Sequence, residues 1–571
     1  MAIYERYTGR DRDSFASLKD AQQNYRISCP DDFNFAYDVI DVLGREKPDK
    51  RALVWLGNGG EEKIFSFADI SRESDRAANF LRRIGIRKGD RVLLVLKRHY
   101  YFWILLMGLH KIGAEEVQAT SMLMAKDYVY RCNAAKIRCV IVTGEDGCTA
   151  HFDEGAADCE TVEMKFVTGS AEVPGWRSFD REFEATPAEW ERPVGEGATK
   201  AGDTMFLCFS SGTTGYPKII THDFRYPLGH IMTGVFWHRC VDGGLHFTVS
   251  DTGWMKAMWG KVYGQWLAES AVMVYDFAKF NADAILSVIE KYRVTTFCVP
   301  PTMYRMILQA DVEKYDLSSL THCNTAGEAL GPDIYNEWLR RTGHKIYEGF
   351  GQSESPVMIA TLYPWTEPTP GAIGLPVPGY DVHIIDEDCA PVPRGVTGEI
   401  CVRVPDREKD RPCGLVVNYN FNEAETAEAY RGGWYHTGDT AYRDEKGLFR
   451  YVGRNDDIIK SSGYRIGPFE IESVLIEHPA VLEAAVTGVP DPQGIRGFLV
   501  KATVVLRPGY EGSPELVKEL QNFVKKNTAP YKYPRIVEFT DALPKTFSGK
   551  IRRTEIRRAD AEKYGKGGAK K

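Results

Sequence analysis

Short apolar runs that alternate with longer amphipathic stretches are the feature that most limits how this chain can fold. Arg91 to Leu96 (RVLLVL) and Cys139 to Val142 (CVIV) predict buried strands, and Tyr101 to Gly113 predicts the helix that follows the first of them. Farther along, Asn281 to Tyr292 predicts an amphipathic helix, and Val294 to Val299 predicts the next strand. Continuous apolar strands separated by helices are typical of sheets covered on both faces. We therefore expect an α/β fold with helices packed on mostly parallel sheets.

The pattern changes twice toward the C-terminus. Around Tyr380 to Val404, short alternating strands are interrupted by prolines and a glycine, which predicts a small β subdomain of hairpins. The segment Asp456 to Ala485 is polar and then helical, Val500 to Leu506 predicts a strand, and Ser513 to Thr528 predicts a helix. This last part is long enough for a compact domain of its own. We expect a large N-terminal domain over residues 1–455 and a small C-terminal α+β domain over residues 456–571.

Composition excludes several classes of protein. The chain has 571 residues and a net charge of −7, which argues against broad nucleic-acid binding. Its best membrane candidate, Tyr101 to Gly108 (YFWILLMG), is far shorter than the roughly 18 apolar residues of a spanning helix. The N-terminus has no apolar segment of signal-peptide length, and the twelve cysteines are scattered without metal-binding spacing. We expect reduced thiols, no transmembrane segment and a cytoplasmic protein.

One loop has the composition of a phosphate site. Residues 210–218 read SSGTTGYPK, in which two glycines allow close backbone approach while hydroxyls and Lys218 suit an anion. The flanking strands that we expect, MFLCF and IITH, make the segment a hairpin turn rather than a strand-to-helix loop. It also lacks the Walker A register. By its own residues the loop is as compatible with a surface turn as with a phosphate site.

Five further motifs follow in order: GEALG (327–331), YEGFGQSE (347–354), YHTGD (435–439), GRNDDIIKSSGYRIGPFEIE (453–472) and PKTFSGK (544–550). With the loop, this series resembles the signature motifs of the adenylate-forming superfamily, which includes acyl-CoA synthetases, nonribosomal adenylation domains and firefly-type luciferases. SDTGW (250–254), SSGYRIGPFE (461–470) and APYKYPR (529–535) are similar to the medium-chain acyl-CoA synthetase branch. The resemblance covers nearly the whole chain and implies that the C-terminal domain is a mobile lid.

The resemblance implies a reaction in two steps. A carboxylic acid attacks the α-phosphate of ATP to give an acyl-adenylate, and the thiol of coenzyme A then displaces AMP. Moving negative charge in this way requires cations and aligned donors more than covalent groups. The residues that it implies as catalytic are Lys550, Ser353 and Glu354. Lys550 would stabilise the carboxylate and the α-phosphate, and Glu354 would hold Mg²⁺, a cation suited to carboxylate oxygen.

The same resemblance assigns a set of residues to ATP and AMP. They are Ser210, Ser211, Gly212, Thr213, Thr214, Gly215, Lys218, Gly327, Glu328, Ala329, Glu348, Gly349, Phe350, Gly351, Gln352, Ser353, Asp439, Arg454 and Lys550. Within this set, Asp439 would accept two hydrogen bonds from the ribose hydroxyls, and Arg454 would contact the ribose or a phosphate. Ser353 and Ala329 stand where the family usually has threonine and often has proline.

A second set is implied for coenzyme A. Its members are Ser462, Gly463, Tyr464, Arg465, Arg496, Lys525, Tyr533 and Arg535, and Gly463 would leave the path of the thiol open. Asp456 matches the hinge of the lid. Four arginines near the C-terminus, at positions 552, 553, 557 and 558, are interpreted as the surface of a helix.

The acyl pocket is expected beside Gly351. Acetate-activating relatives carry tryptophan at this position, and its replacement by hydrogen opens space for several methylenes, each worth about 0.8 kcal/mol when buried. A second tryptophan, above all Trp259, could refill that space. The pocket residues that we expect are Trp237, Trp254, Lys256, Trp259, Cys298 and Gly351. The expected substrate is a short- to medium-chain acid, and branched and aryl acids are included in this class.

Two other functions remain open. The chain could load a separate carrier protein, although it contains no carrier domain of its own. It could also bind nucleotide without turnover, as a sensor, although Lys550, Asp439 and Glu354 are all present. We expect small-molecule partners (the acid, ATP and CoA) and no nucleic acid, and a homo-oligomer is compatible with all of these observations.

Overall fold

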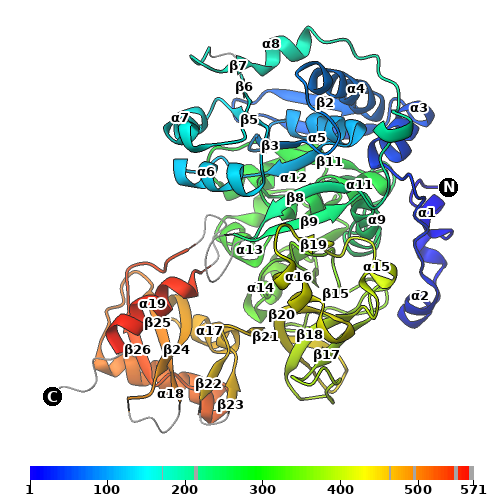
Figure 1. Cartoon of the computed structure of the whole chain (residues 1–571). Helices are drawn as coiled ribbons and strands as arrows, with labels where there is room; N and C mark the ends of the chain where they lie inside the picture. Colours follow the sequence, from blue (N-terminus) through cyan, green and yellow to red (C-terminus); the bar gives the residue numbers. More distant parts are fainter. Residues whose placement is uncertain (170–171, 211–216, 462–463, 493–496, 546–550, 565–571) are drawn as a thin grey trace.

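The computed structural model describes residues 1–169, 172–210, 217–461, 464–492, 497–545 and 551–564, without the side chains of Lys460, Arg465 and Pro530. Two large sheets with helices packed around them form most of the molecule, and a small C-terminal domain lies beside them (Figure 1). The predicted α/β fold class is confirmed.

The first sheet contains the two strands predicted at residues 91–96 and 139–142. Its order is β19 (Asn418–Tyr419), β9 (Ile219–Asp223), β8 (Thr204–Phe209), β4 (Glu115–Gln118), β3 (Arg91–Val95), β5 (Cys139–Thr143), β6 (Met164–Thr168) and β7 (Arg177–Ser178). The strands from β8 to β7 are parallel, while β9 and β19 add antiparallel pairs at one edge. The predicted helix is α5 (Tyr101–Ile112), and every one of its residues is buried.

The second sheet supplies the strand ends that carry the motifs. Its order is β16 (Leu375–Pro376), β15 (Ile359–Ala360), β14 (Ile346–Phe350), β13 (His322–Ala326), β12 (Thr296–Cys298), β10 (Leu245–Thr248), β11 (Ala271–Tyr275), β1 (Arg51–Leu56) and β2 (Glu62–Ser66). The strands from β14 to β1 are parallel. The helix predicted at residues 281–292 is α12 (Ala282–Tyr292). It begins at Ala282 because the side chain of Asn281 caps it by accepting a hydrogen bond from the amide of Ala284.

The predicted β subdomain is a four-stranded antiparallel sheet. Its strands, in order, are β17 (Val382–Ile385), β18 (Gly398–Arg403), β20 (Trp434–Arg443) and β21 (Phe449–Arg454). β21 ends at Arg454, so the chain passes from this sheet directly into the C-terminal domain (Figure 1).

The C-terminal domain mixes helices and strands as expected. It contains β22 (Ile459–Ser461), β23 (Tyr464–Ile466), α17 (Pro468–Glu477), β24 (Val481–Pro490), β25 (Phe498–Leu506), α18 (Pro514–Asn527), β26 (Ile536–Phe539) and α19 (Arg553–Tyr564). The strand and helix predicted at 500–506 and 513–528 are β25 and α18. The helix predicted to run to Ala485 is wrong, because α17 ends at Glu477 and Val481 already begins β24, where pairing with β25 outweighs local helix propensity.

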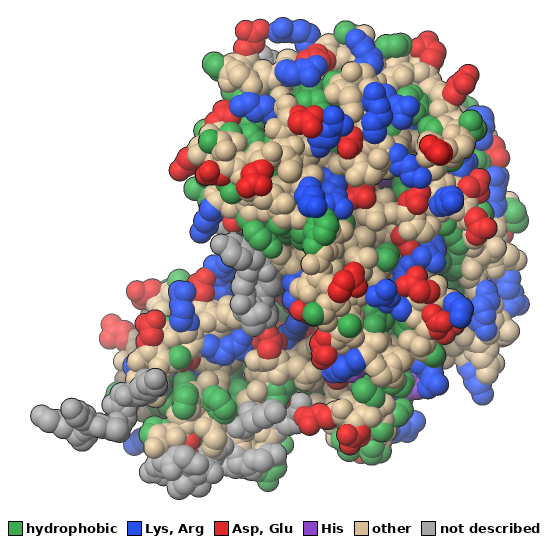
Figure 2. Space-filling view, viewed as in Figure 1, with side chains coloured by type: hydrophobic (Ala, Val, Ile, Leu, Met, Phe, Trp, Pro, Cys, Tyr) green, Lys and Arg blue, Asp and Glu red, His purple; other side chains and the backbone are tan. Residues whose placement is uncertain are grey.

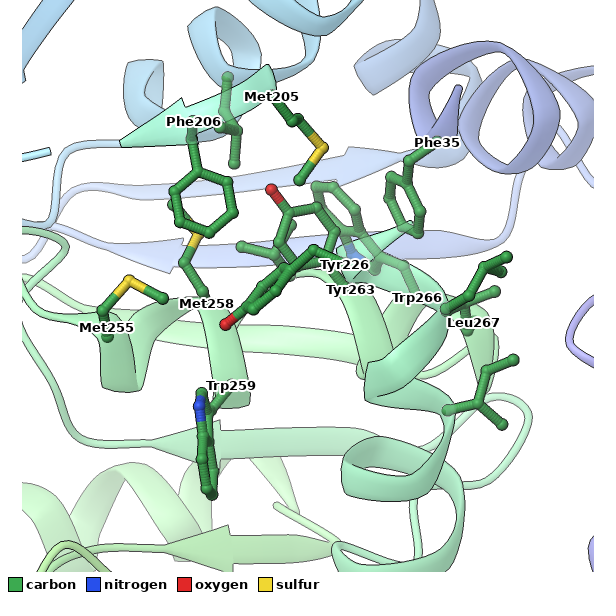
Figure 3. Packing of buried hydrophobic residues seen from close by; sticks show 14 of the residues in the cluster. Phe35, Met205, Phe206, Tyr226, Met255, Met258, Trp259, Tyr263, Trp266 and Leu267 are labelled. Atoms are coloured by element: carbon green, nitrogen blue, oxygen red, sulfur yellow. The ribbon is translucent and has the colours of Figure 1, made fainter. Parts of the chain in front are cut away.

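The largest hydrophobic core lies between the two big sheets. It includes Phe206 of β8, Tyr226 of α9 (Tyr226–Ile231) and Tyr263 of α11 (Tyr263–Leu267), and the rings of Tyr226 and Tyr263 meet edge to face at 5.8 Å (Figure 3). Within the described part of the chain, no helix has the length and apolar character needed to cross a membrane. On the face shown in Figure 2, acidic and basic side chains are interspersed.

Candidate active site

The segment at residues 210–218 lies between two antiparallel neighbours, β8 and β9, as the predicted hairpin requires. At its base, the amide of Ser210 donates to the carbonyl of Lys218 at 2.9 Å. The ammonium of Lys218 pairs with the carboxylate of Glu425 and lies 5.3 Å from the centre of the Tyr419 ring. Ser211, Gly212, Thr213, Thr214 and Gly215 lie outside the described residues.

Two of the motifs meet because β13 and β14 are parallel neighbours. The pairing aligns Ala326 with Gly349, so the segments that follow, Gly327 to Ala329 and Phe350 to Gln352, leave the same edge of the sheet. Gly327 has a φ of +99°, a conformation that glycine adopts without strain. The carboxylate of Glu328 is held by the hydroxyl of Thr302 at 2.7 Å.

Glu348 lies in β14 and is almost fully buried. Burial raises the pKa of its carboxyl group to about 8, although the amide of Leu330, which donates to Oε1 at 3.2 Å, acts in the opposite direction. A carboxyl group that has lost its hydration resists ionisation. Burial therefore favours the protonated form of Glu348.

Ser353 and Glu354 follow β14 and are held by the first sheet. The carbonyl of Ser353 accepts from Nε2 of His222 at 2.9 Å, and Oε1 of Glu354 accepts from the hydroxyl of Tyr419 at 3.2 Å. Burial raises the pKa of Glu354, and the hydrogen bond from Tyr419 opposes the rise. A divalent cation beside this carboxylate would relieve the cost of its ionisation, so the residue fits a Mg²⁺ ligand.

A second carboxylate, Asp439, is brought together with residues from two other segments, β21 and the segment that follows β14. Its Oδ1 accepts from the hydroxyl of Tyr451 at 2.8 Å, its Oδ2 accepts from the amide group of Gln352, and Nη1 of Arg454 lies 3.9 Å from Oδ2. Burial lowers the pKa of Arg454, but the carboxylates of Asp439 and Asp456 outweigh it and raise the pKa. The result is a buried acceptor held by two donors and one cation.

Sequence reasoning missed Tyr451 as a partner of Asp439. Tyr451 and Arg454 both lie on β21, which pairs with β20 and sets Arg454 opposite Asp439. An expected pairing of the YHTGD strand with the strand before GRND could have predicted this contact. The side chain of a tyrosine near the paired position reaches across to the neighbouring strand.

Glu399 on β18 is a further residue that the motifs did not reveal. β18 pairs Cys401 with His436 and Glu399 with Thr440, so β20 bulges at Thr437 to Asp439. Oε1 of Glu399 accepts from the amide of Gly438 at 2.8 Å, and Oε2 lies 3.0 Å from Nδ1 of His436. The carboxylate thus fixes the bulge that presents Asp439.

Two tryptophans lie against the glycines of the GFG segment. A Cβ atom at Gly349 would come within 2.6 Å of the Trp237 ring, and one at Gly351 would come within 2.4 Å of the Trp259 ring. The two indoles meet edge to face at 6.2 Å. In Figure 3, Trp259 extends from α10 (Met255–Gly260) and lies apart from Phe206. The Trp259 ring therefore occupies the space that a side chain at Gly351 would take.

The remaining residues of the predicted pocket are Lys256, Cys298 and Trp254, and only the first two have a described contact with each other. Nζ of Lys256 donates to the carbonyl of Ala326 at 2.9 Å, at the end of β13. Burial raises the pKa of Cys298 at the end of β12, and the neighbouring Lys256 opposes the rise, so these two side chains lie together. Trp254 is half-buried just before α10 and has no ring contact among the described residues. The structure thus brings Trp237 and Trp259 against the GFG segment and places Lys256 beside Cys298. The assignment of Trp254 to the pocket stays a prediction.

The residues predicted for coenzyme A lie on the C-terminal domain. The Tyr533 ring is flanked by the ammonium of Lys525 at 4.0 Å and the guanidinium of Arg535 at 4.4 Å. The Tyr464 ring stacks on that of Tyr531 at 4.0 Å. Ser462, Gly463, Arg496, Lys550 and the side chain of Arg465 lie outside the described residues.

The chain matches two family profiles. The AMP-binding enzyme profile covers residues 41–406, and the AMP-binding enzyme C-terminal domain profile covers residues 470–550. The chain belongs to the AMP-binding enzyme family. The resemblance to adenylate-forming enzymes is confirmed, and the family consists of enzymes.

Relatives match over nearly their whole length. The chain is 39% identical over 567 residues to the mitochondrial acyl-coenzyme A synthetase ACSM3 of Mus musculus, covering 98% of this chain and 96% of that protein. It is 40% identical over 537 residues to ACSM4 of Homo sapiens, covering 92% and 90%.

Solved structures show the same fold. The anthranilate CoA ligase AuaEII in complex with anthranoyl-AMP has a TM-score of 0.83 at 29% identity, covering 94% of this chain and 98% of that chain. A benzoate CoA ligase from Burkholderia xenovorans LB400 has a TM-score of 0.76 at 27% identity, covering 92% and 100%.

Proposed function

We propose that this member of the AMP-binding family is an AMP-forming acyl-CoA synthetase. It would convert ATP and a carboxylic acid into an acyl-adenylate and pyrophosphate, and then transfer the acyl group to coenzyme A with release of AMP. The observation that carries the proposal is the buried Asp439 carboxylate beside the edge where β13 and β14 end.

Asp439 suits a ribose because two neighbouring hydroxyls can donate to one carboxylate in place of Tyr451 and Gln352. Arg454 supplies a cation beside this acceptor, Lys218 would supply a second from the base of the phosphate loop, and Lys550 would add a third at the α-phosphate. Gly327 of the GEALG segment, which has open space where a Cβ atom would lie, allows a base to approach the backbone. Together these groups can orient a nucleotide and offset its charge during transfer.

Mg²⁺ is the second part of the proposal. Glu354 would hold it, and the ion would supply charge neutralisation to the phosphates when bound. The raised pKa of Glu354 supports the assignment, because a carboxyl group enclosed without a cation is a costly arrangement. Ser353 would present its hydroxyl beside the same phosphates.

The acid is proposed to be short, and branched or aryl. Trp237 and Trp259 close the space beside Gly349 and Gly351, so a long linear chain has no room along this wall. Cys298 and Lys256 would border the pocket at the ends of β12 and β13. The anthranilate and benzoate CoA ligases that share this fold are in keeping with a compact acid.

The chain would be divided at Asn455 and Asp456, with residues 456–571 acting as a lid that turns about Asp456. Tyr464, Lys525, Tyr533 and Arg535 would bind coenzyme A on that lid. We also propose a cytoplasmic protein of fatty acid metabolism, although the names of the mammalian relatives place those proteins in mitochondria.

A panel of acids tests the function directly. ATP–pyrophosphate exchange reports adenylation, and AMP release with thioester formation reports the second step. We expect exchange with short branched or aryl acids and thioester with free CoA. Exchange without thioester would favour a carrier-protein substrate, and the absence of exchange with every acid would favour a nucleotide sensor.

A further inference from the structure

The chain segment at the proposed hinge is held by contacts on both of its sides. One set of contacts comes from the N-terminal part of the molecule and the other from the C-terminal domain. On the N-terminal side, the amide of Asn455 donates to the carbonyl of Gly438 at 2.8 Å, and Arg454 approaches the carboxylate of Asp439. Gly438 and Asp439 lie on β20 of the N-terminal part. The backbone is therefore anchored to the nucleotide side through the amide of Asn455.

On the other side, arginines of α19 hold the next two residues. Nη1 of Arg557 donates to the carbonyl of Asp456 at 2.9 Å and also pairs with the carboxylate of Asp457. Nη1 of Arg553 lies 3.8 Å from the same carboxylate. The carbonyl of Asp456 and the side chain of Asp457 are thus attached to the C-terminal helix.

Arg553 is itself fixed in the body of the C-terminal domain. Its guanidinium makes a two-point contact with Glu472 of α17, from Nε at 3.1 Å and from Nη2 at 2.5 Å. Glu472 is almost fully buried and also accepts from the amide of Val486 on β24 at 2.7 Å. Two-point pairs of this kind fix geometry as well as energy. The network joins α19, α17 and β24 to the start of the domain.

The C-terminal arginines that were interpreted as a helix surface differ in their partners. Arg553 and Arg557 point to acidic residues near the hinge, whereas Arg558 is exposed and has no ion pair among the residues that the structure describes. Arg553 and Arg557 are four positions apart, so they lie on one face of α19.

We propose that Arg553 and Arg557 are positioning residues that clamp the outgoing half of the hinge to α19. The pivot is then the backbone of Asn455 and Asp456. The amides of Asp457 and Ile458 donate to the carbonyl of Arg454 across this pivot, so a rotation there must break these two hydrogen bonds. A turn about this pivot carries α17, β24 and α19 as one body. Because α19 begins three residues after Lys550, the clamp sets how accurately a hinge rotation delivers that lysine. The inference rests on the proposed two-step function, and it adds the residues that limit the rotation of the C-terminal domain to the backbone of Asn455 and Asp456.

The test compares Arg557→Met and Arg553→Met with Arg558→Met as the matched control. Hydrogen exchange is measured at the amides of Asp457 and Ile458, which donate to the carbonyl of Arg454 at 3.0 Å and 3.1 Å. We expect roughly tenfold faster exchange at these two amides in both clamp variants, the factor that accompanies loss of one charge-assisted hydrogen bond. The control should exchange like the wild type.

Kinetics supply the second readout. Both ATP–pyrophosphate exchange and thioester formation from supplied acyl-adenylate should slow by roughly tenfold in the clamp variants, with the KM for ATP unchanged, since the Asp439 side is untouched. Arg557→Lys, which keeps one charged donor, should recover part of the loss.

Three outcomes would overturn the clamp: unchanged exchange at Asp457 and Ile458, equal effects in Arg558→Met, or faster exchange across the whole C-terminal domain, which would mean a role in domain stability alone. Failure of the proposed function would look different. The wild type would then show no pyrophosphate exchange, while the hydrogen-exchange comparison would still report whether the clamp exists.

Discussion

At the scale of single residues, Glu348 gives the protein a measurable dependence of stability on pH. Its folded pKa of about 8 lies above the ordinary value of 4.5, so between these values the folded state holds a proton that the unfolded state has lost. The free energy of unfolding therefore falls as pH rises through this window, by up to about 1.4 kcal/mol per pH unit from this group. Below pH 4.5 both states are protonated, and the difference disappears.

Glu348→Gln replaces the titratable carboxyl group with an amide that does not titrate, and the amide oxygen can still accept from the backbone amide of Leu330. We expect the variant to match the wild type near pH 5 and to become relatively more stable toward pH 8, as measured by urea unfolding across that range. Because other buried carboxyl groups also titrate, the quantity to compare is the difference between the two proteins at each pH. A difference that stays constant with pH would show that Glu348 is ionised in the folded protein.

Trp259 is the residue expected to limit the length of the acid. Trp259→Ala should move the optimum of a series from acetate to decanoate toward longer acids, with each newly buried methylene raising kcat/KM by a few-fold, because about 0.8 kcal/mol accompanies its burial. The variant should also lose about 3–5 kcal/mol of stability from the cavity.

Trp176→Ala is the control for that loss of stability. Trp176 is similarly buried but belongs to a separate cluster around Phe152. The Trp176→Ala substitution should destabilise the protein without altering the preferred acid. If Trp259→Ala behaves in the same way, Trp259 is ordinary core. Gly351→Trp is a poor complement, since a Cβ atom there would lie 2.3 Å from the carbonyl oxygen of Pro356 as well as against Trp259.

At the scale of elements, the bulge in β20 connects the carboxylate of Glu399 to Asp439 in the proposed nucleotide site. Glu399→Ala frees the amide of Gly438 and should let Asp439 shift, which raises the KM for ATP. Loss of a hydrogen bond to a charged group typically costs about 1.5–3 kcal/mol, so kcat/KM for ATP should fall by roughly 10- to 100-fold. Steady-state kinetics with ATP and acid varied separately measure this effect.

Glu399→Gln is the matched variant, because its amide oxygen can still accept from Gly438. It should retain most of the affinity for ATP. The KM for the acid should be nearly constant in both variants, since the residues proposed for the acyl pocket, such as Trp259 on α10 and Cys298 on β12, lie outside β18 and β20. A uniform loss for ATP and acid, or an equal loss in Glu399→Gln, would assign Glu399 to general stability.

The elements show where sequence reasoning works and where it stops. Strands such as β3 and β5 are buried on both faces, so they appear as unbroken apolar runs and were predicted nearly to the residue. β24 was interpreted as helix because its residues Leu482 to Ala485 favour helix locally, and only pairing with the distant β25 makes them a strand. Non-local pairing of this kind leaves little trace in a short window.

At the scale of the whole molecule, the same distinction applies to the site. The motifs predicted which segments converge, because each carries residue types that its chemistry needs. They did not predict Tyr451, Glu399, Arg553 or Arg557, which act by holding a motif residue from another element. Such partners are ordinary strand or helix residues in sequence, and only the register of β18, β20 and β21 or the position of α19 reveals them.

Lys550 tests whether the whole molecule works by presenting two faces of one lid. Lys550→Ala should reduce ATP–pyrophosphate exchange by roughly 100- to 1000-fold, the usual effect of removing one donor that stabilises developing charge. Thioester formation from supplied acyl-adenylate and CoA should fall far less, because that step needs the opposite face of the lid. Arg558→Met, exposed on the helix that follows, is the control for a change in charge near the same loop. The two half-reactions are measured separately on each protein. Equal loss in both would mean that Lys550 supports the lid as a structural residue, and the proposed division of labour between its faces would fail.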